Sequence, residues 1–233
     1  MERSSSILLS KSWYITLMAV LVLLLVLHLS VTNGNSLSFW ILQKQFETDN
    51  TTYTEWIVPV QTIIAVLTFC MNLLMAFFYG AMAMHTRKNN TILSIGFWLM
   101  VLINLAFLLL SFVSTIFGFV MKDSTLDTIT SFNQTINIIS IVLFVLQVML
   151  LLVLGICSIF VGKGRMRTGG ILVTVSALLY FFLLIGSHVL QPILASKGNV
   201  IYWYPTDMLF RSLAIILLFS GWGLMLKKSS NNN

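Results

Sequence analysis

The sequence predicts an all-α integral membrane protein, a bundle of six transmembrane helices with both termini on the cytoplasmic side. Three observations support this fold class. Six apolar stretches each reach the length of about 20 residues that crosses a bilayer core. The chain is 58% hydrophobic and only 9% charged, whereas a soluble domain uses roughly 25% charged residues to cover its surface. The basic residues between the stretches are sorted by side.

The first three spans are expected at about 13–31, 57–84 and 92–121. The apolar core of the first span is long for a secretory signal, and no small-residue cleavage pattern follows it, so we interpret it as a retained span. Pro59 lies in the first turn of the second span, where proline is tolerated without a kink. The connection to the third span, 85–91, is too short to hold a domain.

The last three spans are expected at about 136–162, 169–190 and 206–226. Because spans two to four are longer than a bilayer core requires, we expect them to tilt or to project beyond the hydrocarbon. The connection 163–168 is again short, so the chain has no room for a nucleotide-binding module. We therefore predict a single polytopic membrane domain over 1–233.

The charges between the spans predict the orientation. The N-terminal segment, the connections 85–91 and 163–168 and the C-terminal segment carry nine basic residues against one acid, Glu2. The basic residues are Arg3, Lys11, Arg87, Lys88, Lys163, Arg165, Arg167, Lys227 and Lys228. The only basic residues in the other three connections are Lys44, Lys122 and Lys197. Lys and Arg near span ends stay in the cytoplasm, so we expect the plasma (cytoplasmic) membrane with both termini inside.

This sorting also explains the net charge of +6. Basic residues on the inner side are attracted to anionic lipids of the inner leaflet, each by about 1 kcal/mol. We therefore expect the lipid bilayer as a partner and no nucleic acid.

The first outer connection, 32–56, is the longest. It holds an apolar and aromatic cluster beside polar residues, with Leu37, Phe39, Trp40, Ile41, Leu42 and Phe46 as its members. Such a cluster predicts a short helix lying in the outer interface, and a loop folded over the mouth of the bundle fits it equally well. The outer connections of this topology contain two glycosylation sequons, which begin at Asn50 and Asn133.

Ionisable groups inside spans are costly and mark functional sites by default. Arg211 lies about one turn inside the sixth span and four residues after Asp207, so the two share a helix face. His28 and His188 lie near the outer ends of the first and fifth spans. At this shared depth the four form a candidate outward-opening polar pocket. Alternatively, Arg211 snorkels to the outer headgroups beside Asp207, and the histidines only lie at the interface.

Three amides, Asn72, Asn104 and Gln147, lie near the expected midplane. Transporters place substrate sites at this depth, which makes the amides candidate ligand-binding residues. Amides also join neighbouring helices, typically contributing about 0.6 kcal/mol each, and we favour this role for each of them.

Small residues predict where helices pack closely or loosen. Pairs spaced by four predict close packing, and they are Ala76 with Gly80, Ser114 with Gly118, and Ser158 with Gly162. Near the end of the sixth span, Gly221 and Gly223 are expected to loosen the helix locally.

The residues that enzymes need are missing from the spans. No span has two acids, no Gly-x-Ser-x-Gly motif with a partner histidine occurs, and no His, Cys and acid set has metal-ligand spacing. We therefore expect no catalytic residue, no metal and no cofactor, with a lipid-modifying enzyme that uses His28, His188 and Arg211 as a minor alternative.

Two hypotheses of function remain. The first is a non-catalytic transport-related component that binds a small or amphipathic ligand among its helices. The second is an accessory, assembly, immunity or sensor subunit of a membrane complex. In both cases we expect other membrane subunits as partners.

Overall fold

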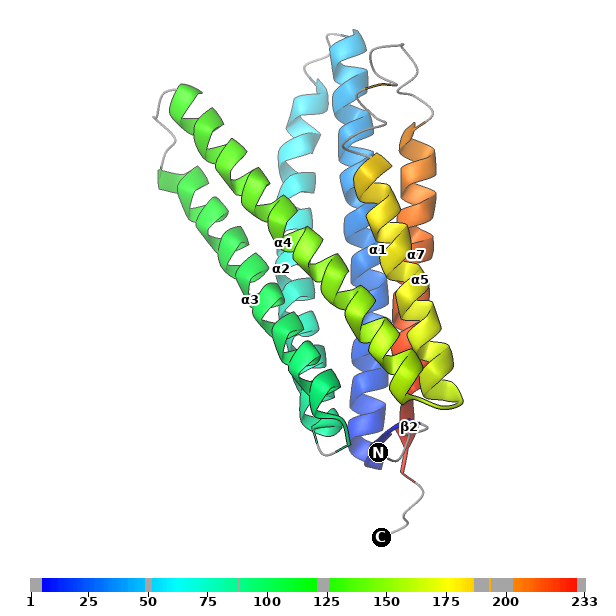
Figure 1. The fold of residues 1–233 in the computed structure, drawn as a ribbon. Coiled ribbons are helices and arrows are strands. Elements are labelled where there is room, and N and C mark those ends of the chain that lie inside the picture. The colour runs from blue at the N-terminus through cyan, green and yellow to red at the C-terminus, as the bar shows by residue number, and fades with distance from the viewer. Residues whose placement is uncertain are drawn as a thin grey trace.

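The computed structural model describes residues 6–48, 52–87, 89–120, 126–186, 193 and 203–229. Within these residues the chain forms six long helices (Figure 1): α1 (Lys11–Thr48), α2 (Thr52–Thr86), α3 (Thr91–Val120), α4 (Leu126–Val161), α5 (Arg165–Ile185) and α7 (Trp203–Met225). Each contains a stretch long and apolar enough to cross a membrane. The prediction of an all-α fold with six such helices is confirmed.

The helices close into a ring in the order of the sequence. Each packs against its neighbours along the chain, and α7 returns to pack against α1. The connections α2–α3 and α4–α5 are short, and each contains a residue that suits the start of the next helix. Asn90 Oδ1 accepts a hydrogen bond from the Leu93 amide at 3.1 Å and so caps the start of α3. Gly164, with φ 52°, adopts the left-handed conformation before α5.

The prediction of a short interfacial helix, or of a loop, within 32–56 is wrong. The backbone of α1 stays helical without a break to Thr48, and α2 begins at Thr52. Gly34 ought to weaken the helix, but it packs against Ile64 of α2, so close that a Cβ at position 34 would lie 3.2 Å from the Ile64 side chain. Packing of the two antiparallel helices therefore outweighs the low helix propensity of this stretch.

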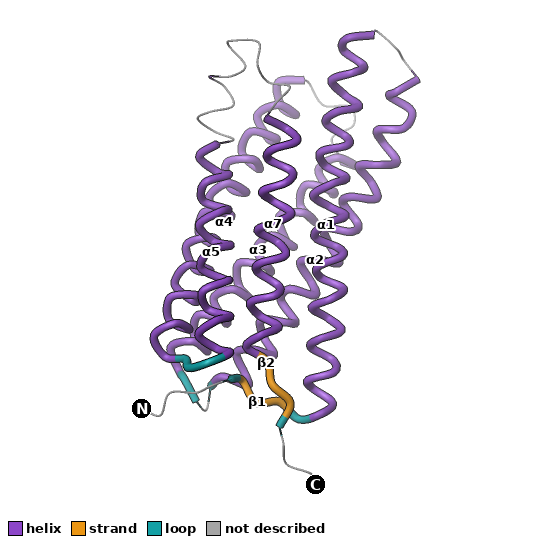
Figure 2. The backbone as a smooth tube through the Cα atoms, turned by 90° about the vertical axis from the view of Figure 1, so that its right-hand side faces the viewer, coloured by secondary structure: helices purple, strands orange, loops and turns teal. Residues whose placement is uncertain are grey.

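A short parallel strand pair, which the sequence did not predict, joins the two ends of the described chain (Figure 2). Strand β1 (Ile7–Leu9) pairs with β2 (Leu226–Lys228), Ile7 opposite Leu226 and Leu9 opposite Lys228. Ile7, Leu9 and Leu226 are buried, and the amide of Ser229 continues the pairing by donating to the Leu9 carbonyl at 2.7 Å. The pair holds the start of α1 beside the end of α7.

We call the end that carries this strand pair the basic end, and the opposite one the far end. The connections α2–α3 and α4–α5 lie at the basic end together with β1 and β2 (Figures 1 and 2). Its exposed basic residues within the described chain are Lys11, Arg87, Lys163, Arg165, Arg167, Lys227 and Lys228. The segments that the charge pattern assigned to one side thus meet at one end of the bundle.

The buried core lies toward the basic end. On α2, α3 and α4 the buried residues fall within 72–86, 93–104 and 148–158, whereas the residues described in 60–71, 105–117 and 131–147 include none that is buried. The α3–α4 hairpin leans away from the other helices toward the far end (Figure 1). On these three helices the described residues are therefore closely packed toward the basic end and more exposed toward the far end.

Three fully buried aromatic side chains fill the centre of the ring, and we call them the aromatic plug: Tyr79 of α2, Phe97 of α3 and Trp222 of α7. Their ring centroids are 6.2 Å apart for Tyr79 and Phe97, 6.0 Å for Tyr79 and Trp222, and 5.3 Å for Phe97 and Trp222. At these separations aromatic rings attract one another beyond the burial of their surface.

Candidate functional site

A cavity of about 260 Å³ lies beside the aromatic plug, on its far-end side. Met75 and Leu218 of its wall are each about one helical turn from the plug residues Tyr79 and Trp222. Among the described residues, five of the six helices supply the wall, and α3 supplies none of it. The described lining residues are His28, Val31, Thr32, Met71, Met75, Phe144, Gln147, Val148, Leu151, Tyr180, Arg211, Ile215 and Leu218.

Three polar residues of the wall share one depth. Gln147 on α4, Tyr180 on α5 and Arg211 on α7 lie about four turns, roughly 22 Å, from the basic ends of their helices. A bilayer core is about 30 Å thick. If the core begins near the basic end, these residues lie beyond its midplane.

Asp207 and Arg211 form an ion pair along one face of α7. Arg211 Nε donates to Asp207 Oδ2 at 2.6 Å, and the side chains are 33% and 16% exposed. The helical spacing of four residues produces this contact, as the sequence predicted. Arg211 lines the cavity, whereas Asp207 is not among the lining residues. Asp207 therefore acts on the cavity through its ion pair with Arg211.

His28 enters the wall from α1, on the opposite side of the ring from α4. Its ring lies against Phe219 of α7 with the centroids 5.3 Å apart. Its Nε2 atom is buried and has no hydrogen-bond partner among the described residues. The imidazole thus lines the cavity with a ring whose Nε2 atom is buried.

Of the seven candidate residues, the structure brings His28, Gln147 and Arg211 into one wall, with Asp207 directly behind Arg211. Asn104 is 1% exposed, and its Nδ2 donates to the Met100 carbonyl of its own helix at 2.7 Å. Asn72 is buried on α2 outside the lining set. His188 lies outside the described residues. The three amides therefore do not form one midplane site.

Two polar residues of the wall were missed by sequence reasoning. Tyr180 is 9% exposed, and its ring meets Phe144 edge-on at 6.0 Å. It lies within an apolar run, where a tyrosine is indistinguishable from an ordinary core aromatic. Thr32 lies just past the expected end of the first span and was therefore assigned to a loop. Matching the depth of polar residues along their spans would have found Tyr180, which lies about as far from the basic end as Gln147 and Arg211.

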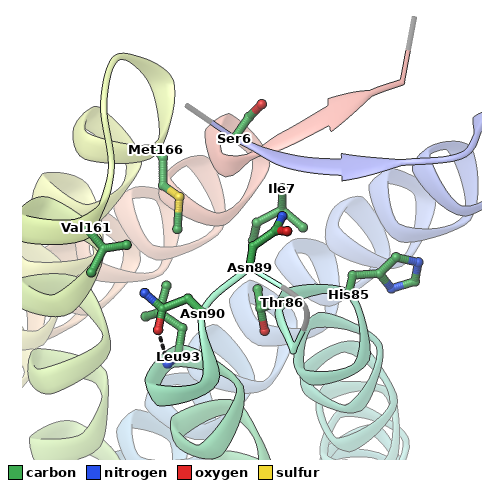
Figure 3. A pocket seen from close by; sticks show the side chains of 9 residues that line it. All are labelled: Ser6, Ile7, His85, Thr86, Asn89, Asn90, Leu93, Val161 and Met166. Atoms are coloured by element: carbon green, nitrogen blue, oxygen red, sulfur yellow. Dashed lines mark hydrogen bonds between the residues drawn. The ribbon is translucent and has the colours of Figure 1, made fainter. Parts of the chain in front are cut away.

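A second recess lies at the basic end, where β1 crosses the α2–α3 connection (Figure 3). Its lining residues are Ser6, Ile7, His85, Thr86, Asn89, Asn90, Leu93, Val161 and Met166. Its volume of about 10 Å³ is that of about one water molecule. The recess is too small for an organic ligand, so the larger of these two cavities is the candidate site.

The described part of the chain contains no group of three or more His, Cys, Asp or Glu side chains close enough to hold a metal ion. The chemistry that the larger cavity offers is hydrogen bonding and apolar contact. No protein-family model, curated protein or solved structure matches this chain.

Proposed function

We propose that this chain is a non-catalytic, transport-related membrane component that binds a small or amphipathic molecule inside its ring of helices. Support comes from one observation, the cavity of about 260 Å³. Ligand sites are mostly apolar with a few placed polar groups and usually enclose about 300–1,000 Å³. An apolar cavity of roughly 150 Å³ already binds benzene. The cavity combines an apolar majority with Gln147, Tyr180 and Arg211.

Access to the cavity is proposed from the far end. The aromatic plug and the strand pair lie between the cavity and the basic end, and both are packed tightly. Toward the far end the described residues of α2, α3 and α4 carry exposed apolar side chains, such as Leu109 and Ile138 at 63% and 62% exposed. An amphipathic molecule in the outer half of a bilayer would meet these side chains first.

We further propose that the basic end is cytoplasmic, because basic residues near span ends remain there. To test this, Arg165→Cys and Asn133→Cys are made separately in a Cys70→Ala, Cys157→Ala background. A membrane-impermeant maleimide should label position 133 in intact cells, and position 165 only after the cells are permeabilised. Both positions are exposed in the structure, at opposite ends of α4 and its connection. Labelling of position 165 in intact cells contradicts the orientation and the outward-facing cavity.

The binding test compares two amides at similar depth, the half-buried Gln147 and the buried Asn104. Protein in nanodiscs is heated with octanamide, octanoate or octylammonium, and the stabilisation is converted to an affinity. Gln147→Leu removes an amide from the wall and should weaken the best probe about fivefold, the value of about one hydrogen bond. Asn104→Leu removes an amide that bonds within α3 and should leave the affinity unchanged.

Arg211→Leu applies the same test to the charged residue of the wall. It should lower the affinity for the most tightly bound probe at least as much as Gln147→Leu does. If no probe stabilises the wild-type protein, the binding function is wrong, and an accessory or sensor role becomes the better hypothesis. If Asn104→Leu weakens binding as much as Gln147→Leu, the ligand lies elsewhere in the bundle.

A further inference from the structure

We infer that Asp207 determines which ligands the cavity accepts: by neutralising Arg211 it selects a head group that is polar but uncharged, such as an amide, an ester or an alcohol, on a short apolar tail. This rests on the proposed binding function of the cavity. Asp207 acts through Arg211 and is in this sense a specificity-determining residue that does not itself line the wall.

The first step concerns the charge of the wall. Arg211 is the only Asp, Glu, Lys or Arg among the described residues that line the cavity. Its Nε lies 2.6 Å from Asp207 Oδ2, so the two formal charges cancel within one hydrogen bond. A ligand in the cavity therefore meets a site with no net charge from this pair.

The second step is the cost of a charged ligand there. Moving an ion from water into a poorly solvated site costs several kcal/mol of solvation free energy, unless the site offers an unpaired opposite charge. An anion at Arg211 would place a second negative charge close to Asp207. A cation would be repelled by the guanidinium, because Arg211 lines the cavity and Asp207 does not. An uncharged head group avoids both penalties.

The third step is the match of hydrogen-bonding groups. A guanidinium only donates, so Arg211 favours a ligand that carries an acceptor oxygen. The Gln147 amide and the Tyr180 hydroxyl both donate and accept. An amide or alcohol satisfies such a set without bringing charge. The tail would then lie along the apolar part of the wall, which includes Met71, Met75 and Val148.

The test changes the net charge of the Asp207–Arg211 pair by removing one of its two charges at a time. At pH 8 free imidazoles are mostly uncharged. At this pH the affinities of octanamide, octanoate and octylammonium are compared in nanodiscs whose lipid has no net charge. Wild type should bind octanamide most tightly. In Asp207→Asn, octanoate should gain about tenfold or more, because the carboxylate that balances the charge of Arg211 is then absent, while octanamide changes less than twofold. In Arg211→Gln, octylammonium should gain instead.

Asn at position 207 keeps an oxygen that accepts the Arg211 Nε–H, so the local fold is expected to persist. Should Asp207→Asn fail to fold, the octylammonium gain in Arg211→Gln decides the question alone. Because each probe is compared between variants in the same bilayer, its partitioning into lipid cancels. Equal octanoate affinity in wild type and Asp207→Asn, with octanamide still bound, overturns the role of Asp207 and leaves the cavity as a binding site. Absence of binding by all three probes in every form overturns the binding function and this inference together.

Discussion

Trp222→Ala is expected to lower the free energy of unfolding by about 3–5 kcal/mol, the usual cost of truncating a large, fully buried aromatic side chain. The Trp222 side chain is 0% exposed and packs edge-on against both other members of the aromatic plug, Tyr79 and Phe97. Its removal leaves a void where α2, α3 and α7 meet, next to the existing cavity. Unfolding in mixed micelles by added denaturing detergent measures the loss.

Trp98→Ala is the matched control, because Trp98 follows Phe97 on α3 and is 47% exposed. In lipid or detergent an outward-facing apolar side chain gains no hydrophobic stabilisation from its surroundings, so this change should cost less than about 1 kcal/mol. Equal losses for Trp98→Ala and Trp222→Ala would show that the plug does not hold the helices together, and that the closed basic end depends on other contacts.

The number of helices and their alternating direction could be predicted from the sequence, because bilayer thickness fixes the length of an apolar span and basic residues mark one side. The continuation of α1 past Gly34 could not, since it depends on Ile64 of another helix. The strand pair could not be predicted either. Each strand has three residues, and their pairing exists only once α1 and α7 lie side by side.

The candidate site was predicted only in part. His28 and Arg211 were expected in the outer half of the membrane and Gln147 near its midplane, yet the three residues line one cavity. Whether a side chain faces the centre of the ring depends on how the helices pack. Asn104 lies at a similar depth on α3, yet none of the described residues of α3 lines the cavity. The Asp207–Arg211 pair was predicted because both residues belong to one helix.

Gly221→Ala should destabilise the bundle by about 1–3 kcal/mol, the usual cost of overpacking a tight contact. The expectation that Gly221 loosens its helix is wrong, because α5 and α7 touch at this point. A Cβ on Gly221 would lie 2.8 Å from the Gly169 carbonyl oxygen and 2.9 Å from Val173 Cγ2. Alanine is favoured over glycine inside a helix by about 1 kcal/mol, so a net loss means that the clash exceeds this gain.

Gly223→Ala separates the clash from the gain in helix propensity, because Gly223 lies on the same helix and the nearest atom to its added Cβ would be 3.9 Å away, on Leu21. That distance is an ordinary contact, so we expect no loss and a gain of up to about 1 kcal/mol. The two variants should therefore differ in sign when unfolding is measured in the same micelles. Stabilisation by both would mean that α5 and α7 can separate at Gly169 without cost, and that close backbone contact at these glycines does not hold the two helices together.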